Sequence, residues 1–429
     1  MIRILRTVLL FTISASLFSS CGEDRTYEYL EMTQENQWTF SKMNEVYLWK
    51  EAIKEPTRTT FFSNTSKFFS SLLYKDDKVS FFVDSVSAGT YGITFAVMRD
   101  PINERPSKTY ALALDVAPGS PADIAGVERG TWIDAVNGTA LTTAKYSMLQ
   151  SGPAAKVSTA YIDYDDENAK YFWVASDTLD MPASTDIEAN AVYLDSIYAQ
   201  RSKNIGYLVL NSFDGDDFVQ QTQDILMDFD AADVDAVILD LRYCHGGSIA
   251  NAASMAGCFV SEELCGTPFC HLVDNYGVVD TTYCYMPQHA NLDDKKLYII
   301  IGAGTYGTAE LFTASVNAAR PMYDVLTVGA VTAGANVMTS EYASPYGFTI
   351  NPATSFIATA DSTLLQPAGI KPDYPINELE QIERIYPLGN GQEFLLYNIM
   401  YFIENDRFPV SGNSSASILI RKQGKAFKR

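Results

Sequence analysis

Apolar residues recur with different periods in three successive regions of the chain. Residues 27–75 carry aromatic and aliphatic side chains at helical spacing, which predicts a small helical domain. Residues of about 80–178 show short alternating runs, such as 110–116, separated by turn residues, and this pattern is typical of β-strands. From residue 186 onward buried strands alternate with helices, as in an α/β core. The expected fold class is therefore multidomain α+β.

In the third region the expected elements can be placed individually. The strands are short aliphatic runs, and the helices either carry one apolar face or are rich in small residues. Functional side chains in such a core are expected at strand ends. We expect strands at 205–210, 234–240, 297–302 and 325–328, and helices at 218–229 and 248–259.

The β-rich region contains a short helix and a hairpin that can be predicted in detail. Ser120 can cap a helix, Pro121 suits its first turn, and Gly126 can close it in a left-handed conformation. The Asn-Gly pair at 137–138 follows a strand at 132–136 and favours a type I′ hairpin turn.

The N-terminal residues have the three-part pattern of an export signal. Two arginines precede a mostly apolar run at 8–18, which is too short to span a bilayer. Residues 17–21 resemble a bacterial lipoprotein cleavage box, although Phe18 is bulkier than the usual aliphatic. We therefore expect residues 1–20 to be a lipoprotein signal peptide and Cys21 to carry a lipid anchor at the outer membrane or cell surface. The alternative is an ordinary secreted protein.

The charge balance narrows the class of partner. The formal net charge is −21, and removal of residues 1–20 makes it more negative because that segment contains two arginines and no acidic residue. An acidic surface repels phosphate backbones, so we expect no nucleic-acid binding. The basic segment 409–429 is expected to be a solvated tail.

The cysteines other than Cys21 are odd in number and lack the spacing of a zinc site. We therefore expect buried thiols with at most one disulfide, no metal and no cofactor. These residues are Cys244, Cys258, Cys265, Cys270 and Cys284.

Three motifs occur along the chain, namely residues 43–49, the run 238–242 followed by Gly246 and Gly247, and residues 369–374. In this order they resemble the C-terminal processing (tail-specific) proteases, which are Ser/Lys peptidases with a PDZ domain. The first motif resembles the helical N-terminal domain of one branch of that family, the second its strand and glycine turn, and the third its closing motif. The resemblance implies five segments: a signal peptide at 1–20, a helical domain at 21–79, a PDZ-like domain at 80–178, a protease-like core at 186–408 and the tail at 409–429.

The PDZ-like region contains a candidate peptide groove. The run Tyr91-Gly92-Ile93-Thr94-Phe95 resembles the carboxylate-binding loop and adjoining strand of a PDZ domain. Such domains add the C-terminus of a peptide as a strand to a sheet edge. The resemblance therefore implies peptides or protein C-termini as partners.

The positions that carry catalysis in this family hold residues without that chemistry. By resemblance, Gly307 occupies the nucleophile position, Ala335 the position of the lysine base, and Thr339 that of the orienting glutamine. A hydroxyl nucleophile needs a base within hydrogen-bond reach, so these changes remove a whole mechanism. Gly246 and Gly247 remain as the remnant of an oxyanion hole, with a tight turn as the alternative interpretation.

Three functions stay open at this point. The sequence favours a non-catalytic, lipid-anchored relative of the processing proteases that binds peptides. A second hypothesis is an active endopeptidase in which Thr305 or Thr308, beside Gly307, replaces the nucleophile. A third is an accessory subunit of an envelope assembly that binds no peptide.

Overall fold

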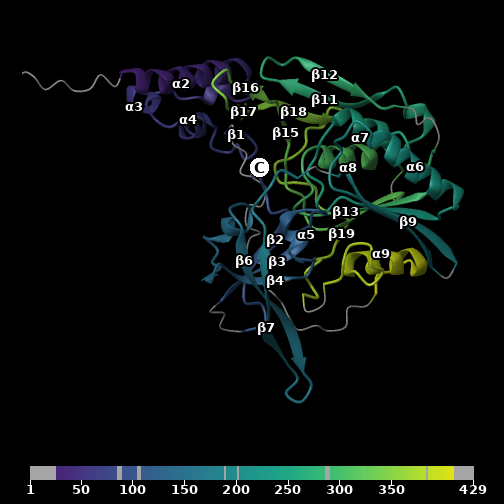
Figure 1. Ribbon diagram of the computed structural model, residues 1–429. Helices are drawn as coiled ribbons and strands as arrows, with labels where there is room; N and C mark the ends of the chain where they lie inside the picture. Colours follow the sequence, from purple (N-terminus) through teal and green to yellow (C-terminus); the bar gives the residue numbers. More distant parts are fainter. Residues whose placement is uncertain are drawn as a thin grey trace, which may run out of the picture. The chain divides into compact units, whose positions relative to one another are not determined.

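The computed structural model describes most of the chain, with gaps (Figure 1). The chain forms two compact units, the first made of the described residues up to 84 together with 340–353, and the second of the remainder. In the described part, no helix is both long enough and apolar enough to cross a membrane. The predicted signal peptide, Cys21 and nearly all of the predicted basic tail lie outside the described residues. The described ranges are 26–84, 89–103, 108–187, 190–200, 202–285, 290–321, 323–382 and 385–409.

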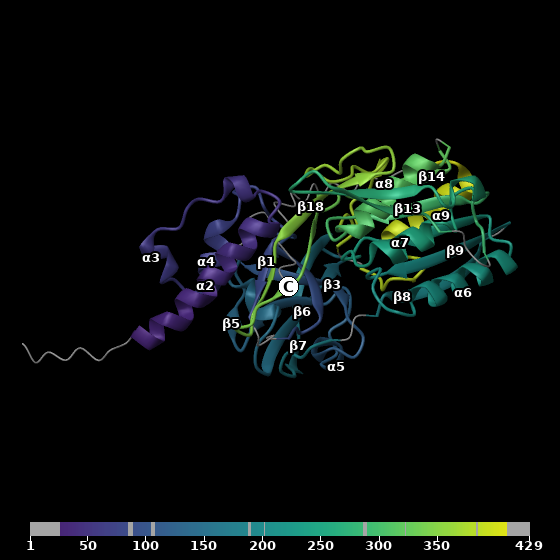
Figure 2. The ribbon, with the colours of Figure 1, turned by 90° about the horizontal axis from the view of Figure 1, so that it is seen from above.

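The first unit is helical at its N-terminal end, as the pattern of residues 27–75 predicts (Figure 2). Its core contains Met43, Tyr47 and Phe68, all fully buried. The Tyr47 hydroxyl donates to the carboxylate of Asp77 at 2.7 Å. The elements are α2 (Thr26–Val46), η1 (Lys50–Ala52), α3 (Arg58–Phe61), α4 (Thr65–Leu72), β1 (Phe81–Val83), β16 (Tyr342–Ala343) and β17 (Thr349–Asn351).

The hairpin of β16 and β17 joins this unit from a distant part of the sequence. Strand β17 lies antiparallel to β1, with Phe82 opposite Ile350. The hairpin carries Phe348, whose ring stacks on Phe82 at 5.1 Å and meets the edge of Trp38 at 5.6 Å. The sequence placed this hairpin within the range of the α/β core, and its aromatic side chain explains why it packs with the helical unit instead.

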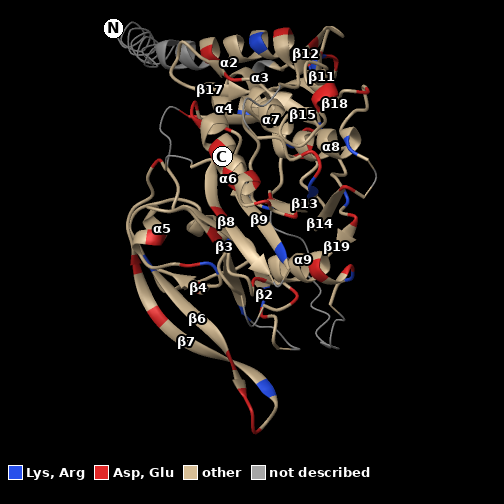
Figure 3. Ribbon diagram, turned by 90° about the vertical axis from the view of Figure 1, so that its right-hand side faces the viewer, with Lys and Arg blue, Asp and Glu red and all other residues tan. Residues whose placement is uncertain are grey.

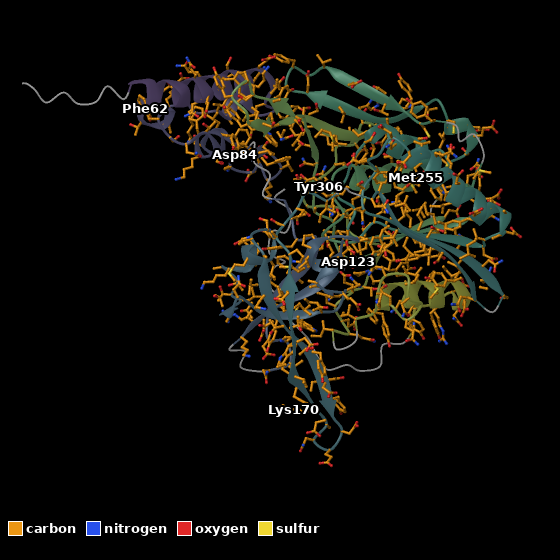
Figure 4. All side chains as sticks on the ribbon, viewed as in Figure 1. Phe62, Asp84, Asp123, Lys170, Met255 and Tyr306 are labelled. Carbon is orange, nitrogen blue, oxygen red and sulfur yellow. The ribbon has the colours of Figure 1, made fainter. Side chains whose placement is uncertain are left out.

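The second unit contains an antiparallel sheet in the order β2-β3-β4-β6-β7, with β5 paired to β4. The Ser120 hydroxyl accepts the N–H of Asp123, as expected of a helix cap, and Asn137 and Gly138 have φ values of 49° and 73°, as a type I′ turn requires. Strands β6 and β7 form a long ribbon with Lys170 near its turn (Figure 4). The elements are β2 (Ile93–Arg99), β3 (Thr109–Val116), α5 (Pro121–Ile124), β4 (Trp132–Val136), β5 (Thr139–Ala140), η2 (Tyr146–Leu149), β6 (Ala155–Asp165) and β7 (Lys170–Met181).

The core of the second unit is a sheet in the order β19-β14-β13-β10-β9-β8. All its neighbours pair in parallel except β8, which is antiparallel to β9. The expected strands and helices are found at their predicted places within a few residues, and the mixed α+β fold class is confirmed. The elements are β8 (Val192–Gln200), β9 (Lys203–Leu210), α6 (Phe218–Ala231), β10 (Ala236–Asp240), α7 (Ile249–Ala256), β13 (Lys296–Ile301), α8 (Thr308–Ala319), β14 (Val325–Gly329), β19 (Tyr374–Pro375) and α9 (Phe394–Asn405).

Alternate side chains of the parallel strands build two apolar layers. Leu208 and Leu239 belong to the layer under α6, α7 and α8. Tyr207 and Ile238 point to the opposite face, where they pack with α9 and with Tyr110 of the antiparallel sheet. Figure 1 shows α9 on the side of the sheet away from the other helices. This alternation follows from the period of two in a strand that is buried on both faces.

A smaller antiparallel sheet in the order β12-β11-β18-β15 completes the second unit. Its strands β11 and β12 follow α7 and the short helix η3 (Glu262–Leu264), whereas β15 and β18 come after β14. Its strands are β11 (Pro268–Asp274), β12 (Val279–Tyr283), β15 (Val337–Thr339) and β18 (Ala353–Thr359).

Candidate functional site

Four of the predicted site residues follow three neighbouring parallel strands. Gly246 and Gly247 come after β10, Gly307 comes after β13, and Ala335 comes after β14. These strands pair in parallel, with β13 in the middle. Their carboxyl ends therefore meet at one edge of the sheet, where α/β proteins place their ligand sites.

Gly307 forms the sharp turn that leads into α8. Its φ of 57° and ψ of −112° are a conformation that costs a residue with a side chain about 1–3 kcal/mol. A strained strand-to-helix turn also presents the nucleophile of α/β hydrolases. A Cβ built on Gly307 would meet no atom within 4 Å, so the position has room for a side chain.

The buried carboxylate of Glu310 joins this turn to the loop after β14. It accepts the N–H of Gly307 at 3.2 Å and the N–H of Ala335 at 2.7 Å on the same oxygen. Because both nitrogens donate to one oxygen atom, the Gly307 turn and the Ala335 loop lie side by side. The other oxygen accepts the N–H of Gly334 at 2.8 Å and the hydroxyl of Thr332. Burial raises the pKa of Glu310, and these hydrogen bonds oppose the rise.

The glycine turn after β10 lies against the Gly307 turn. Gly246 and Gly247 have φ values of 96° and 116°, which favour glycine. A Cβ on Gly246 would lie 3.4 Å from the nitrogen of Thr308 and 3.9 Å from the Cα of Gly307. The Thr308 hydroxyl donates to the carbonyl of Gly247 at 2.6 Å. Within the described residues, the N–H of Gly247 donates to no backbone carbonyl.

Ala335 is 2% exposed, so its methyl group is buried in the position expected for the base. Thr339 ends β15 and is half-buried. In the described ranges no hydrogen bond joins Thr339 to the Gly307 turn or to Glu310. The structure therefore brings Gly307, Ala335 and the glycine turn together and leaves Thr339 at the side.

Thr305, Thr308 and Cys244, whose hydroxyl and thiol groups belong to the turns around Gly307, are all buried. Thr305 is fully buried, and its hydroxyl donates to the carbonyl of Leu241 at 2.8 Å and accepts the N–H of Gly302. Thr308 is 2% exposed and donates to Gly247 as described above. Cys244 is fully buried, and burial raises the pKa of its thiol to about 12.

A buried ion-pair network anchors the start of the glycine turn. The Arg242 guanidinium contacts Asp240 at 2.7 Å and Glu393 at 2.7 Å. Burial opposes ionisation of Glu393, but the charge and hydrogen bonds of Arg242 lower its pKa to about 2. Asp240 and Arg242 are neighbours at the end of β10, whereas Glu393 lies too far along the chain for any local sequence signal.

Arg129 ties the antiparallel sheet to the same network. Its guanidinium donates to the hydroxyl of Tyr243 at 2.7 Å and contacts Glu378 and Glu393 at 3.2 and 3.3 Å. Its Nε donates to the carbonyl of Tyr386 at 3.0 Å. Arg129 therefore fixes the loop after α5 to Tyr243, the residue that follows Arg242.

The residues predicted for the peptide groove lie along an exposed sheet edge. Strand β2 is the outermost strand of its sheet and is half-buried from Ile93 to Met98. Tyr91 is buried and its hydroxyl donates to the carbonyl of Pro153. Gly92 has a φ of 79° and donates its N–H to the Thr90 hydroxyl at 3.0 Å.

Aromatic and small side chains from two neighbouring elements, η2 and α5, lie beside this edge. The ring of Phe95 on β2 meets that of Tyr146 on η2 edge-on, with centroids 6.4 Å apart. A Cβ on Gly92 would lie 2.3 Å from the Cβ of Ser120, the cap of α5. The loop therefore has no space for a side chain at Gly92.

The described residues contain no group of three or more His, Cys, Asp or Glu side chains arranged to hold a metal ion. The cysteines from Cys244 to Cys284 are free thiols, of which only Cys265 is half-buried rather than buried. Acidic positions are spread over the ribbon (Figure 3), in keeping with 52 acidic and 31 basic residues.

Comparison with known proteins identifies the family of the chain. Residues 204–376 match the family described as Peptidase family S41, and residues 34–81 match the Peptidase S41 N-terminal domain. A solved protein from Bacteroides fragilis NCTC 9343, named as an S41 protease, is 24% identical, with 86% of this chain and 97% of that chain covered and a TM-score of 0.72. The photosystem II D1 C-terminal processing protease is 16% identical, with 81% and 93% covered and a TM-score of 0.51. No curated protein matches at a significant level. The order of the two matched regions and the shared fold show that the chain belongs to peptidase family S41.

Proposed function

We propose that this S41 family member is a lipid-anchored protein of the bacterial envelope that lacks peptidase activity and binds the C-termini of peptides or proteins. The observation that carries the proposal is Gly307 in the turn where the family resemblance expects the nucleophile. Glycine offers no group that can attack a carbonyl, and Ala335 offers no amine to act as the base.

The surroundings of Gly307 argue against a displaced nucleophile. A substitute must reach the substrate and lie within hydrogen-bond reach of a base. Thr305 and Thr308 are buried, and their hydroxyls donate to backbone carbonyls. The Cys244 thiol is buried and its raised pKa keeps it protonated at neutral pH.

The frame around the turn supports a binding role. Glu310 still connects the Gly307 turn to the loop of Ala335 through backbone N–H groups. The edge of β2 offers unpaired backbone groups to an added strand, and Phe95 and Tyr146 offer an apolar wall. The Thr90 hydroxyl and the Gly92 amide, which now bond each other, are the groups closest to a bound carboxylate in this proposal.

Activity is tested with a fluorophosphonate probe and a peptide-cleavage assay, using an S41 peptidase with Ser and Lys as the positive control. We expect neither labelling nor cleavage by the purified protein. Labelling that disappears in Thr305→Ala or Thr308→Ala would establish the displaced nucleophile and overturn the proposal.

Binding is tested by titrating labelled peptides that end in either a free carboxylate or a carboxamide. We expect the free acids to bind more tightly and Gly92→Val to abolish binding, because the Cβ has no space. Gly119→Ala is the matched control, since Gly119 has a similar φ of 73° and open space around it. Equal binding of acids and amides would refute carboxylate capture, and binding of neither would favour an accessory subunit.

The anchor is tested by labelling cells with a radioactive fatty acid and separating their membranes. We expect label and membrane association for the wild type and neither for Cys21→Ser. A Cys21→Ser protein that still fractionates with membranes would show that another feature attaches the chain.

A further inference from the structure

Cysteine thiols from three segments gather beside the hairpin of β11 and β12. Cys258 follows α7, Cys265 follows η3, and Cys284 follows β12. The backbone brings the last two segments together, because the N–H of Gly266 donates to the carbonyl of Cys284 at 2.9 Å. The N–H of Cys284 in turn donates to the carbonyl of Thr267 at 2.9 Å. Gly266 and Thr267 thus both pair with Cys284, as two residues opposite one do in a β-bulge. Cys265 directly precedes them in the sequence.

The thiols of Cys265 and Cys284 also share a hydrogen-bond acceptor. Both donate to the carbonyl of Tyr285, at 3.6 and 3.9 Å. Disulfides join residues whose backbones are already neighbours, and the backbone bonds between Gly266, Thr267 and Cys284 make Cys265 and Cys284 such a pair.

The exposure of the thiols fixes the order in which they react. Cys265 is half-buried, whereas Cys258 and Cys284 are buried. An oxidant from solvent therefore reaches Cys265 first. Cys258 is the competing partner, because burial raises the pKa of its thiol and the neighbouring Cys265 and Cys284 raise it further. Within the described residues, however, its thiol makes no hydrogen bond to the Tyr285 carbonyl that the other two share.

We propose that Cys265 and Cys284 form a disulfide that closes the β11–β12 hairpin when the protein meets a disulfide oxidant. The Cys265 thiolate attacks the external disulfide, forming a mixed disulfide and releasing one thiolate. The Cys284 thiol then loses its proton to solvent and attacks the Cys265 sulfur, which releases the second thiolate. The external disulfide takes up two electrons, and the two cysteines give up two electrons and two protons. This inference goes beyond the proposed function and holds in either outcome of its tests.

The bond is tested on the purified full chain by incubation with oxidised glutathione, alkylation of the remaining thiols, and peptide mapping by mass spectrometry. We expect one cross-linked peptide pair that joins Cys265 to Cys284. Cys265→Ser and Cys284→Ser each abolish the pair, whereas the matched controls Cys258→Ser and Cys270→Ser retain it. A bridge to Cys258, a glutathione adduct that persists on Cys265, or recovery of Cys265 and Cys284 as free thiols would overturn the proposal.

Thermal unfolding provides a second measurement that needs no variant. The bond closes a loop of about 20 residues and restricts the unfolded chain, so we expect the oxidised wild type to have a Tm several degrees above that of the reduced protein. A Tm that is unchanged or lower after complete cross-linking would show that the native hairpin does not accept the bond.

Discussion

Arg242 holds together two buried carboxylates at the start of the glycine turn, so its replacement is the sharpest test of how this site is anchored. The guanidinium is 2% exposed and contacts Asp240 and Glu393, each 1% exposed. The substitution Arg242→Met keeps much of the volume and removes the charge. Glu393 would then keep Arg129 and the N–H of Leu396, whereas Asp240 would keep the hydroxyl of Tyr207 and the backbone N–H of residue 242.

Removing one partner of a buried ion pair costs about 3–5 kcal/mol, because the other charge stays buried without compensation. We therefore expect Arg242→Met to lower the free energy of unfolding of the second unit by about this amount. Urea unfolding followed by tryptophan fluorescence reports it, since Trp132 and Trp173 belong to the apolar layer beside the network. The matched control is Lys203→Met, which removes an exposed pair with Asp235 and should cost about 0–1 kcal/mol.

The stability difference between the wild type and Arg242→Met should also change with pH in a defined direction. In the wild type the pKa of Glu393 is about 2, below its usual value of 4.5, so its ionised form still stabilises the fold at pH 5. Without Arg242, burial raises the folded pKa of Glu393, so the variant gains stability as the pH falls through that value. The difference between wild type and variant should therefore shrink from pH 7 to pH 5. A cost below 1 kcal/mol, or a difference that widens on acidification, would refute this reasoning.

Other positions of the second unit give further expected outcomes. Burial raises the pKa of Asp115 to about 6 from its usual 3.8, although Arg129 opposes the rise. The free energy of unfolding of the wild type therefore falls by up to about 3 kcal/mol as the pH rises between these values. Urea unfolding of Asp115→Asn should show a gain of that size over the wild type at pH 7 and no gain below pH 4. Glu310→Gln removes an acceptor from buried N–H donors and should lower the free energy of unfolding by about 1–3 kcal/mol per unpaired donor, whereas the exposed Glu263→Gln should leave it unchanged. Gly247→Ala places a Cβ 2.8 Å from the nitrogen of Asp214 and should lower the Tm more than Gly277→Ala, which has a similar positive φ and open space; equal effects would contradict the steric argument.

The sequence predicts those parts of the fold in which neighbouring residues decide the structure. The strand expected at 234–240, the cap at Ser120 and the turn at Asn137 depend on local alternation, capping and φ preference. The strand is found at 236–240, and the cap and the turn are found where expected. The position of Gly307 at the head of α8 also follows from its own motif.

The contacts that hold the site together could not be predicted in this way. Glu310 reaches the loop of Ala335, 25 residues away, and Arg242 reaches Glu393, 151 residues away. Both bonds depend on how parallel strands and α9 are arranged in space, and no periodicity encodes that arrangement. The hairpin that carries Phe348 joined the helical unit for the same reason.

The arrangement also explains how the turn can keep its shape with glycine and alanine at the positions where the family resemblance expects catalytic residues. Glu310 binds backbone N–H groups of Gly307 and Ala335, so its hydrogen bonds do not depend on which side chains stand there. A side chain at Gly307 would have to accept the strained φ of 57°, and a lysine at Ala335 would have to lose its hydration in a buried position. Glycine and alanine avoid both costs. In the proposed function, the frame therefore persists without the catalytic groups because those groups work against the stability of the frame that positions them.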